Sequence, residues 1–514
     1  MNKKIRLIAL LLALTLIITG CSSSPEGKGN TPDITTEKVD DTNSAEEDGS
    51  VSSAGEGSSA APGSEASSDV AGDASASGEG SSSESSSSTD GSASEVAASA
   101  DGSGSETADT TDDSASGTAT ELPEIIPGEE DYEEWYSDMV EASIVSTGNN
   151  ARLKKVIEKA RAGSEIRVAA IGGSVTEGAG AVVNKEGYAY RFASAFEKNY
   201  CPEGAGNMTF VNAGLSGTPS SLGIMRYDRD VVGLLGGAPD LLIIEFSVND
   251  SGEATHGQAY SSMIHRALTD NPDCAVILLF AVFKSKWNMQ TNYIPEGEIY
   301  ELPMVSIKDA IVVPYFNGDL NNDLFFSDEY HPKTYGHQIM SDCLMHLIGL
   351  VDREAPETAP EVPEHGIRKV FYEHTTMITA DPESLEEGVT LDPGSFTLTD
   401  KSVQSMFFTG KAAFAQNFMH DKEGGNDPFT LKLTCKKLLL NFKTSNSKSF
   451  GLAEVLVDGA PVAACNGWAS GGWNNCNVVS VIDAEESAEH TVEIRMAEGF
   501  EDKSFTILSL GYAK

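Results

Sequence analysis

Four apolar runs in the middle of the chain restrict its fold more than any other feature of the sequence. They are Ile166–Ile171, Met208–Val211, Asp240–Phe246 and Cys274–Phe283. Nearly continuous Val, Ile, Leu and Phe residues are typical of strands that are buried on both faces of a parallel sheet. Each run is preceded by a stretch with helical spacing, at residues 150–162, 188–199, 220–235 and 258–268. This alternation predicts a three-layer α/β/α domain with a parallel sheet.

The segment after the fourth run contains only a short apolar stretch. We expect residues 284–325 to be mainly loop, with a short strand at Ile311–Val313. A closing helix follows from about Thr334 to Leu350. With an acidic lead-in, these elements predict an α/β domain over residues 123–352. The Pro- and Glu-rich residues 353–365 are then expected to form a linker.

Beyond this linker the pattern changes to short runs in which apolar and polar residues alternate. Examples are Phe429–Thr434, Leu438–Phe442 and Thr491–Arg495. A period of two is typical of strands with one buried face, and Val457-Asp-Gly459 offers a tight hairpin turn. We therefore predict that residues 366–514 form an all-β sandwich, a jelly-roll-like accessory domain.

The N-terminal part of the chain has a composition that does not support a folded core. Residues 22–120 contain 21 Asp and Glu residues against two Lys residues, and they contain no aromatic residue. Such a segment cannot bury enough apolar surface to offset the entropy lost on folding. Residues 21–122 are therefore predicted to be a disordered tether.

The first residues have the features of an export signal. Lys3, Lys4 and Arg6 precede an apolar run from Leu7 to Ile18, which is too short to span a bilayer but suits a secretory signal. The run ends in Ile-Thr-Gly-Cys21, which resembles the lipobox of bacterial lipoproteins. This resemblance implies removal of residues 1–20 and lipid attachment to Cys21. We expect an extracytoplasmic protein that is lipid-anchored to the bacterial cell membrane; an ordinary signal peptide is the alternative.

The net charge and the cysteine spacing argue against nucleic-acid binding and against a zinc site. A formal net charge of −43 argues against a nucleic-acid partner, because binding phosphates requires clustered Lys and Arg. No Cys pair has the spacing of a zinc site, so we expect no metal, and no motif implies a cofactor. Export would permit a disulfide, for which Cys465 and Cys476 are the expected pair. Cys274 and Cys343 lie in apolar stretches and are expected to be buried thiols.

Several polar residues and glycines follow the ends of the predicted strands. Ser174 comes after two glycines at the end of the first run, and we expect it at the carboxyl edge of the sheet, where open α/β folds place their sites. Gly217 follows the second run and Asn249 the third. A backbone N–H and a neutral amide can both stabilise a developing oxyanion. Taken singly, each of these segments could equally be an ordinary turn.

A fourth segment carries a histidine and a carboxylate three residues apart. Asp328 and His331 lie in the loop before the closing helix. The ordinary pKa of imidazole, about 6.5, suits a general base near neutral pH. A carboxylate next to the other ring nitrogen would fix the tautomer of the imidazole and stabilise its charged form.

The order of these residues along one α/β domain resembles that of the SGNH (GDSL-like) hydrolase family. The resemblance implies that Ser174 is the nucleophile and that His331 is the general base, oriented by Asp328. It also implies an oxyanion hole formed by the backbone N–H groups of Ser174 and Gly217 and by the side chain of Asn249.

The resemblance covers residues 165–350 and has one clear departure. Gly173 stands where the name motif of the family has Asp. That Asp belongs neither to the catalytic triad nor to the oxyanion hole, so we expect altered hydrogen bonding in the loop rather than lost activity.

The domain context suggests the substrate. An exported SGNH-like domain joined to a β-sandwich resembles bacterial carbohydrate esterases, which implies a serine esterase that hydrolyses small acyl esters, above all acetyl esters, on a polysaccharide or other glycan. The alternatives are a lipase or acylhydrolase, an O-acetyltransferase of the same fold, or a non-catalytic carbohydrate-binding lipoprotein.

The β domain carries two tryptophans that bear on this question. Trp468 and Trp473 lie in a Gly-rich segment, and exposed indole faces bind sugar rings well. The alternative, which the sequence slightly favours, is that both indoles pack into the sandwich or stiffen its loop.

Overall fold

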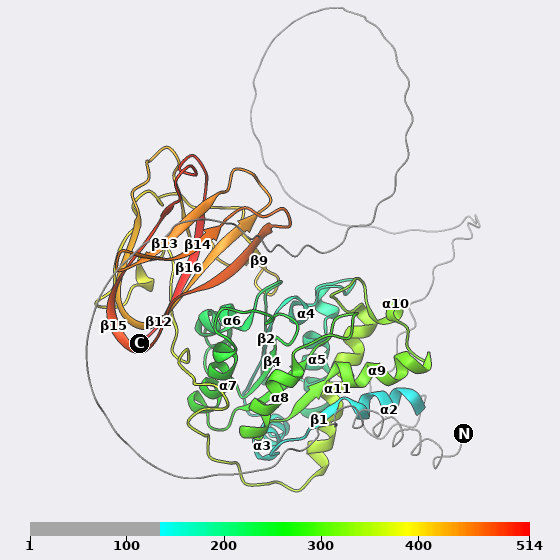
Figure 1. Cartoon of the computed structure of the whole chain (residues 1–514). Helices are drawn as coiled ribbons and strands as arrows, with labels where there is room; N and C mark the ends of the chain where they lie inside the picture. The colour runs from blue at the N-terminus through cyan, green and yellow to red at the C-terminus, as the bar shows by residue number, and fades with distance from the viewer. Residues whose placement is uncertain (1–133) are drawn as a thin grey trace, which may run out of the picture. The chain divides into compact units, whose positions relative to one another are not determined.

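The computed structural model describes residues 134–514 (Figure 1). The predicted signal peptide, the lipidation of Cys21, the tether and the first residues of the 123–352 domain lie outside this range, so these predictions are not tested. Among the helices of residues 134–514, none is long and apolar enough to cross a membrane.

A six-stranded sheet forms the centre of the α/β domain, with the strand order β1-β6-β5-β4-β2-β3. The strands are β1 (Ile144–Ser146), β2 (Ile166–Gly172), β3 (Met208–Gly214), β4 (Leu241–Glu245), β5 (Ala275–Phe280) and β6 (Met304–Ser306). Strands β2 to β6 are parallel, and β1 pairs antiparallel with β6 at the edge. The predicted parallel sheet is confirmed, and each of its four apolar runs overlaps a strand.

Helices cover both faces of this sheet (Figure 1). One hydrophobic cluster contains Val168 and Ala170 of β2 with residues of α2 (Glu134–Ala142), α3 (Ala151–Arg161), α5 (Tyr188–Tyr200), α9 (Ile307–Asn317) and α11 (Thr334–Arg353). The opposite cluster contains Ala169 and Ile171 with residues of α6 (Ser220–Met225), α7 (Gln258–Asp270) and α8 (Gln290–Ile299). Successive residues of β2 therefore face different layers, which explains the continuous apolar runs. The three-layer prediction is confirmed.

The segment 284–325 differs from the expectation. It contains α8, β6, α9 and α10 (Asn322–Phe325), so the predicted strand at Ile311–Val313 is wrong. These residues lie inside α9, whose buried positions are Ile307, Ala310, Ile311 and Pro314. That spacing is helical, and Val313 points outward with 55% of its surface exposed.

The C-terminal domain is all-β, as predicted, and its strands pair antiparallel. Its eight-stranded sheet has the order β11-β16-β12-β15-β13-β14, with β7 paired to β16 and β8 to β12. The strands are β7 (Thr376–Ile378), β8 (Thr390–Asp392), β11 (Phe418–Met419), β12 (Phe429–Ser445), β13 (Leu452–Val457), β14 (Ala460–Asn466), β15 (Trp473–Met496) and β16 (Thr506–Ala513). The runs expected as separate strands are joined in the long strands β12 and β15, which pair along most of their length.

Of two local predictions for this domain, the hairpin turn is confirmed and the disulfide is not. Asp458 and Gly459 both have positive φ, 51° and 80°, and they connect β13 to β14 as the predicted two-residue hairpin turn. The expected disulfide is wrong, because Cys465 and Cys476 are both free thiols. They belong to different hydrophobic clusters, so their side chains do not meet.

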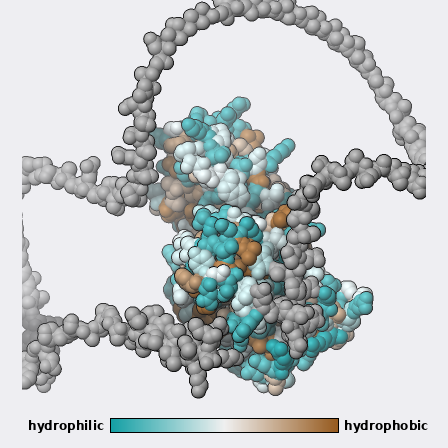
Figure 2. Space-filling model, turned by 90° about the vertical axis from the view of Figure 1, so that its right-hand side faces the viewer, coloured by the Kyte–Doolittle hydropathy of each residue, from teal (hydrophilic) through white to brown (hydrophobic). Residues whose placement is uncertain are grey.

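Figure 2 shows one face of the molecule coloured by hydropathy. Where grey atoms do not cover it, hydrophobic residues form small groups between hydrophilic ones. This mixture is ordinary for the surface of a folded domain.

Candidate active site

Ser174 lies at the point where the strand order of the parallel sheet reverses. It follows β2, which pairs with β3 on one side and with β4 on the other. In open α/β sheets, ligands bind at the carboxyl ends of the strands beside such a switch point. Gly217 follows β3 and Asn249 follows β4, so three predicted site residues lie at this one edge.

The structure brings the predicted triad residues together. The Nε2 atom of His331 lies 3.0 Å from the Oγ atom of Ser174. The Nδ1 atom of His331 lies 2.9 Å from Oδ2 of Asp328. The other carboxylate oxygen of Asp328 accepts hydrogen bonds from the backbone N–H groups of Tyr330, at 2.7 Å, and of His331, at 2.9 Å. The loop backbone thus holds the carboxylate in the orientation that the imidazole requires.

The charge of Asp328 fits this arrangement. Burial would raise the pKa of Asp328, but the hydrogen bonds from the His331 ring and from the two backbone N–H groups outweigh it and lower this pKa below its usual value. Because a carboxylate can only accept a hydrogen bond, the proton of the ring is expected on Nδ1. The Nε2 atom can then accept the proton of the Ser174 hydroxyl.

The three predicted oxyanion donors are free to act at this edge of the sheet. Ser174 is the first residue of the short helix α4 (Ser174–Glu177), so its N–H has no partner within the helix. Gly217 has a φ of +68°, a conformation that favours glycine, and among residues 134–514 its N–H has no hydrogen-bond acceptor. The carbonyl oxygen of the Asn249 side chain is buried without a partner, so this amide is not held by another side chain.

Gly173 lies against the side chain of Asn249. A Cβ atom at Gly173 would collide with the side-chain amide of Asn249. In this backbone, glycine therefore leaves room for the predicted oxyanion donor, and the expectation that the loop change does not abolish activity stays a prediction.

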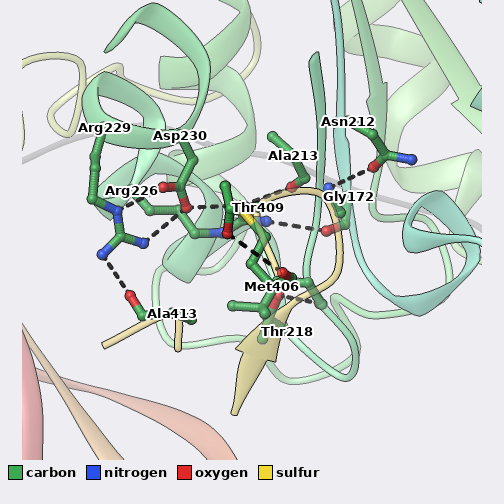
Figure 3. A network of polar contacts seen from close by, with 12 residues as sticks. Gly172, Asn212, Ala213, Thr218, Arg226, Arg229, Asp230, Met406, Thr409 and Ala413 are labelled. Atoms are coloured by element: carbon green, nitrogen blue, oxygen red, sulfur yellow. Dashed lines mark hydrogen bonds and ion pairs between the residues drawn. The ribbon is translucent and has the colours of Figure 1, made fainter. Parts of the chain in front are cut away.

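Arg226, for which the sequence motifs predict no role, supports this edge from below. This fully buried side chain donates hydrogen bonds to the carbonyl groups of Ala213, at 2.6 Å, and Gly172, at 3.1 Å (Figure 3). These carbonyls lie at the ends of β3 and β2, just before the Gly217 and Ser174 segments. Asp230 is 3.4 Å from the guanidinium and balances its charge. The sequence signal that could have indicated a buried structural arginine is its place within the otherwise apolar stretch 222–227.

Aromatic side chains lie on two sides of the site. Trp473 packs over Gly217, with its Cζ2 atom 3.1 Å from the place that a Cβ atom would take. This indole is 51% exposed and that of Trp468 is 36% exposed, so neither is buried in the core of the sandwich. The other part of that alternative, that they stiffen their loop, stays a prediction. Next to His331, the ring of Tyr330 meets Phe283 edge to face, and Phe283 stacks on the exposed Trp287.

Two buried carboxyl groups lie behind the site. Glu245 accepts a hydrogen bond from the hydroxyl of Thr176 at 3.0 Å, and Asp250 accepts one from Tyr293 at 2.6 Å. Burial raises the pKa of Glu245 from 4.5 to about 8 and that of Asp250 from 3.8 to about 7. Both groups therefore hold their proton in the folded protein at pH values where they lose it in the unfolded chain.

This difference predicts a pH-dependent contribution of Glu245 to stability. The contribution is fully present below pH 4.5 and is lost as the pH rises to about 8, because only the unfolded state releases the proton in this window. The Glu245→Gln variant lacks the titration. The free energy of unfolding of the variant minus that of the wild type should therefore increase by about 2 to 3 kcal/mol from about pH 5.5 to about pH 7.5. Chemical denaturation of both proteins at the two pH values measures this difference. The same substitution at the exposed Glu203 should show no such change, and a pH-independent difference for Glu245→Gln would contradict the prediction.

Comparisons with known proteins show what this chain is similar to. Residues 170–339 match the model of the GDSL-like lipase/acylhydrolase family. No curated protein is similar enough in sequence to match. Among solved structures, a two-domain esterase active on acetylated mannans is similar at 26% identity with a TM-score of 0.64, over 73% of this chain and 98% of that one. The same kind of esterase co-crystallized with mannopentaose is similar at 25% identity with a TM-score of 0.63, over the same shares. Residues 170–339 are therefore similar to the GDSL-like lipase/acylhydrolase family, and this likeness, together with the similar solved esterases, supports a serine esterase.

Proposed function

We propose that this protein removes acetyl groups from a carbohydrate polymer outside the cytoplasm, through an acyl-enzyme intermediate on Ser174. The observation that carries the proposal is the line of hydrogen bonds from Asp328 through His331 to the Ser174 hydroxyl, at the open edge of the sheet. A serine, an imidazole and a carboxylate in this order form the constellation of serine hydrolases on several unrelated folds.

The steps of the reaction follow from the positions of these groups. His331 accepts the proton of Ser174 while the serine oxygen attacks the acetyl carbonyl. The N–H groups of Ser174, Gly217 and Asn249 stabilise the negative oxygen of the tetrahedral intermediate. The imidazolium then protonates the departing sugar oxygen as its bond to the acetyl carbon breaks, so the sugar leaves as an alcohol and the acetyl group stays on Ser174. Water, deprotonated by the same imidazole, releases acetate and restores the serine.

The carbohydrate substrate is supported by two independent observations. The solved esterases to which the chain is similar act on acetylated mannans, and one was crystallized with a mannose oligosaccharide. In this chain, exposed indole faces lie on both sides of the site, Trp473 beside Gly217 and Trp287 in the cluster next to His331. Flat apolar rings of this kind bind the C–H faces of pyranose rings.

The extracytoplasmic location is proposed from the sequence. The lipobox-like segment before Cys21 would place a lipid at the start of the mature chain. A flexible tether of about 100 residues would have a root-mean-square span of about 55 Å. An esterase on such a tether could reach polymers beyond the membrane surface.

Release of acetate from polymers tests the proposed function. The purified protein should liberate acetate from acetylated mannan, and among nitrophenyl esters it should prefer acetate to butyrate and longer chains. Acetylated xylan, pectin and peptidoglycan are compared in the same assay, with Ser174→Ala as the blank. A preference for long acyl chains would favour a lipase, and transfer of acetyl groups to an added sugar instead of water would favour an acetyltransferase. Either result would overturn the proposal.

A further inference from the structure

A side chain from the β domain is hydrogen-bonded to the segment that carries Gly217. Gln404, just before β9 (Ser405–Met406), donates a hydrogen bond from Nε2 to the carbonyl oxygen of Ser216 at 2.7 Å. Its Oε1 atom accepts a longer bond, 3.4 Å, from the N–H of Cys476 in β15. Gln404 is buried, so both ends of its amide are committed to these partners.

The same segment is held from the other side by the helix of the nucleophile. Glu177, in α4, accepts hydrogen bonds from the N–H and from the hydroxyl of Ser216, the former at 3.0 Å. Its other carboxylate oxygen accepts the N–H of Phe407 at 3.2 Å, which is a second contact with the β domain. Ser216 is thus fixed between Ser174's own helix and residues that follow the linker.

The bond to Ser216 has a direct consequence for the predicted oxyanion hole. The carbonyl of Ser216 and the N–H of Gly217 belong to one planar peptide group, in which they point in opposite directions. Fixing the oxygen therefore fixes the direction of the N–H. Glycine allows this peptide to rotate more freely than any other residue would, so the orientation needs an external anchor.

We infer that Gln404 is a positioning residue for the esterase reaction: it anchors the Ser216–Gly217 peptide so that the Gly217 N–H points toward the developing oxyanion. The inference rests on the proposed function, because it needs an oxyanion at this place. It also makes the β domain a working part of the catalytic site, in addition to any contact with the polymer.

The expected effect is on turnover rather than on binding of a small substrate. In the Gln404→Met variant the peptide loses its anchor while the side-chain volume is nearly kept. We expect kcat for nitrophenyl acetate to fall at least ten-fold, with KM changed less than two-fold. The fall should be smaller than that of Asn249→Ala, which removes a donor outright and should cost about 10²-fold to 10³-fold.

The experiment uses the full chain. It includes two measurements that would not change in the expected way if Gln404 only stabilised the fold. Affinity for a boronic acid, which forms a tetrahedral adduct with a serine, should weaken by a factor similar to the fall in kcat, and the pH profile should keep its shape. Gln404→Glu is the second variant, because it still accepts the Cys476 N–H but no longer donates to Ser216. His265→Ala is the control: it removes a different contact between the two domains, that of His265 with Glu373.

Each outcome decides the inference. A kcat within two-fold of wild type in either folded Gln404 variant would overturn it, as would an equal loss in the His265→Ala control. A melting temperature that matches the wild type, together with the loss of kcat, supports it. If the wild type itself hydrolyses no ester, the proposed function fails instead, so the two failures are distinguishable.

Discussion

Replacing Ser174 by alanine should lower kcat for a small acetyl ester by about 10⁶-fold. The change removes the attacking oxygen, and the Nε2 atom of His331, now 3.0 Å from that oxygen, would have only water to activate. Alanine is an excellent helix former, and it suits the first position of α4, so the fold should be unaffected. Initial rates with nitrophenyl acetate and the melting temperature of both proteins measure the two parts of this expectation.

The matched control is a second serine close to the same histidine. The hydroxyl of Ser327 donates to the backbone carbonyl of His331 at 3.1 Å, within the loop that carries the base. The Ser327→Ala variant should retain most of the activity, because its hydroxyl does not face the ester in the proposed mechanism. Should Ser174→Ala keep more than about 1% of the wild-type rate, the assignment of the nucleophile would be wrong, since the hole and the binding surfaces alone retain far less.

The parallel sheet was predictable because its strands are buried on both faces. A residue such as Ala169 packs on one helical layer and its neighbour Ala170 on the other, so β2 is apolar apart from the partly exposed Arg167 near its start. The segment 284–325 was not predicted correctly because its sequence carries signals that usually end a helix. Its helices α8 and α9 each contain a proline, Pro295 and Pro314, and proline usually marks the end of a helix rather than its interior.

The triad residues could be predicted because their short motifs, in this order along the chain, resemble those of the SGNH (GDSL-like) hydrolase family. Asp328 and His331 are three residues apart, and the backbone of that loop alone sets their contact. Their meeting with Ser174, 157 residues away in the chain, was implied by that resemblance, whereas the parallel topology accounts only for the place of Ser174 at the carboxyl edge of the sheet.

The hydrogen bonds that hold the site from other parts of the chain could not be predicted in this way. Gln404 and Ser216 are separated by 188 residues and belong to different domains, and nothing in the local sequence of either indicates a partner. The disulfide prediction failed for a related reason: Cys465 and Cys476 are close in the chain, but the strands that carry them turn the two thiols into different hydrophobic clusters. Long-range contacts between side chains require the structure.

The Asp328→Asn variant should lower kcat by about 10³-fold to 10⁴-fold. An asparagine can donate its amide hydrogen to Nδ1 of His331, and this would place the ring proton on Nε2. The protonated Nε2 atom could then no longer accept the proton of the Ser174 hydroxyl. The variant also loses the negative charge that stabilises the imidazolium. Because the Asp328 side chain is 51% exposed, water can replace part of this stabilisation, so the lower end of the range is reasonable.

Steady-state rates measure the effect of Asp328→Asn, and the neighbouring Glu329→Gln is its control, because this exposed carboxylate lies 3.5 Å from Lys284 and has no contact with the imidazole. The control should change kcat less than two-fold. If Asp328→Asn stays within ten-fold of the wild type, the contact of 2.9 Å between Asp328 and His331 is only a feature of the loop. The tautomer of His331 would then have to be set by the serine and by solvent, and the mechanism would reduce to a Ser-His pair.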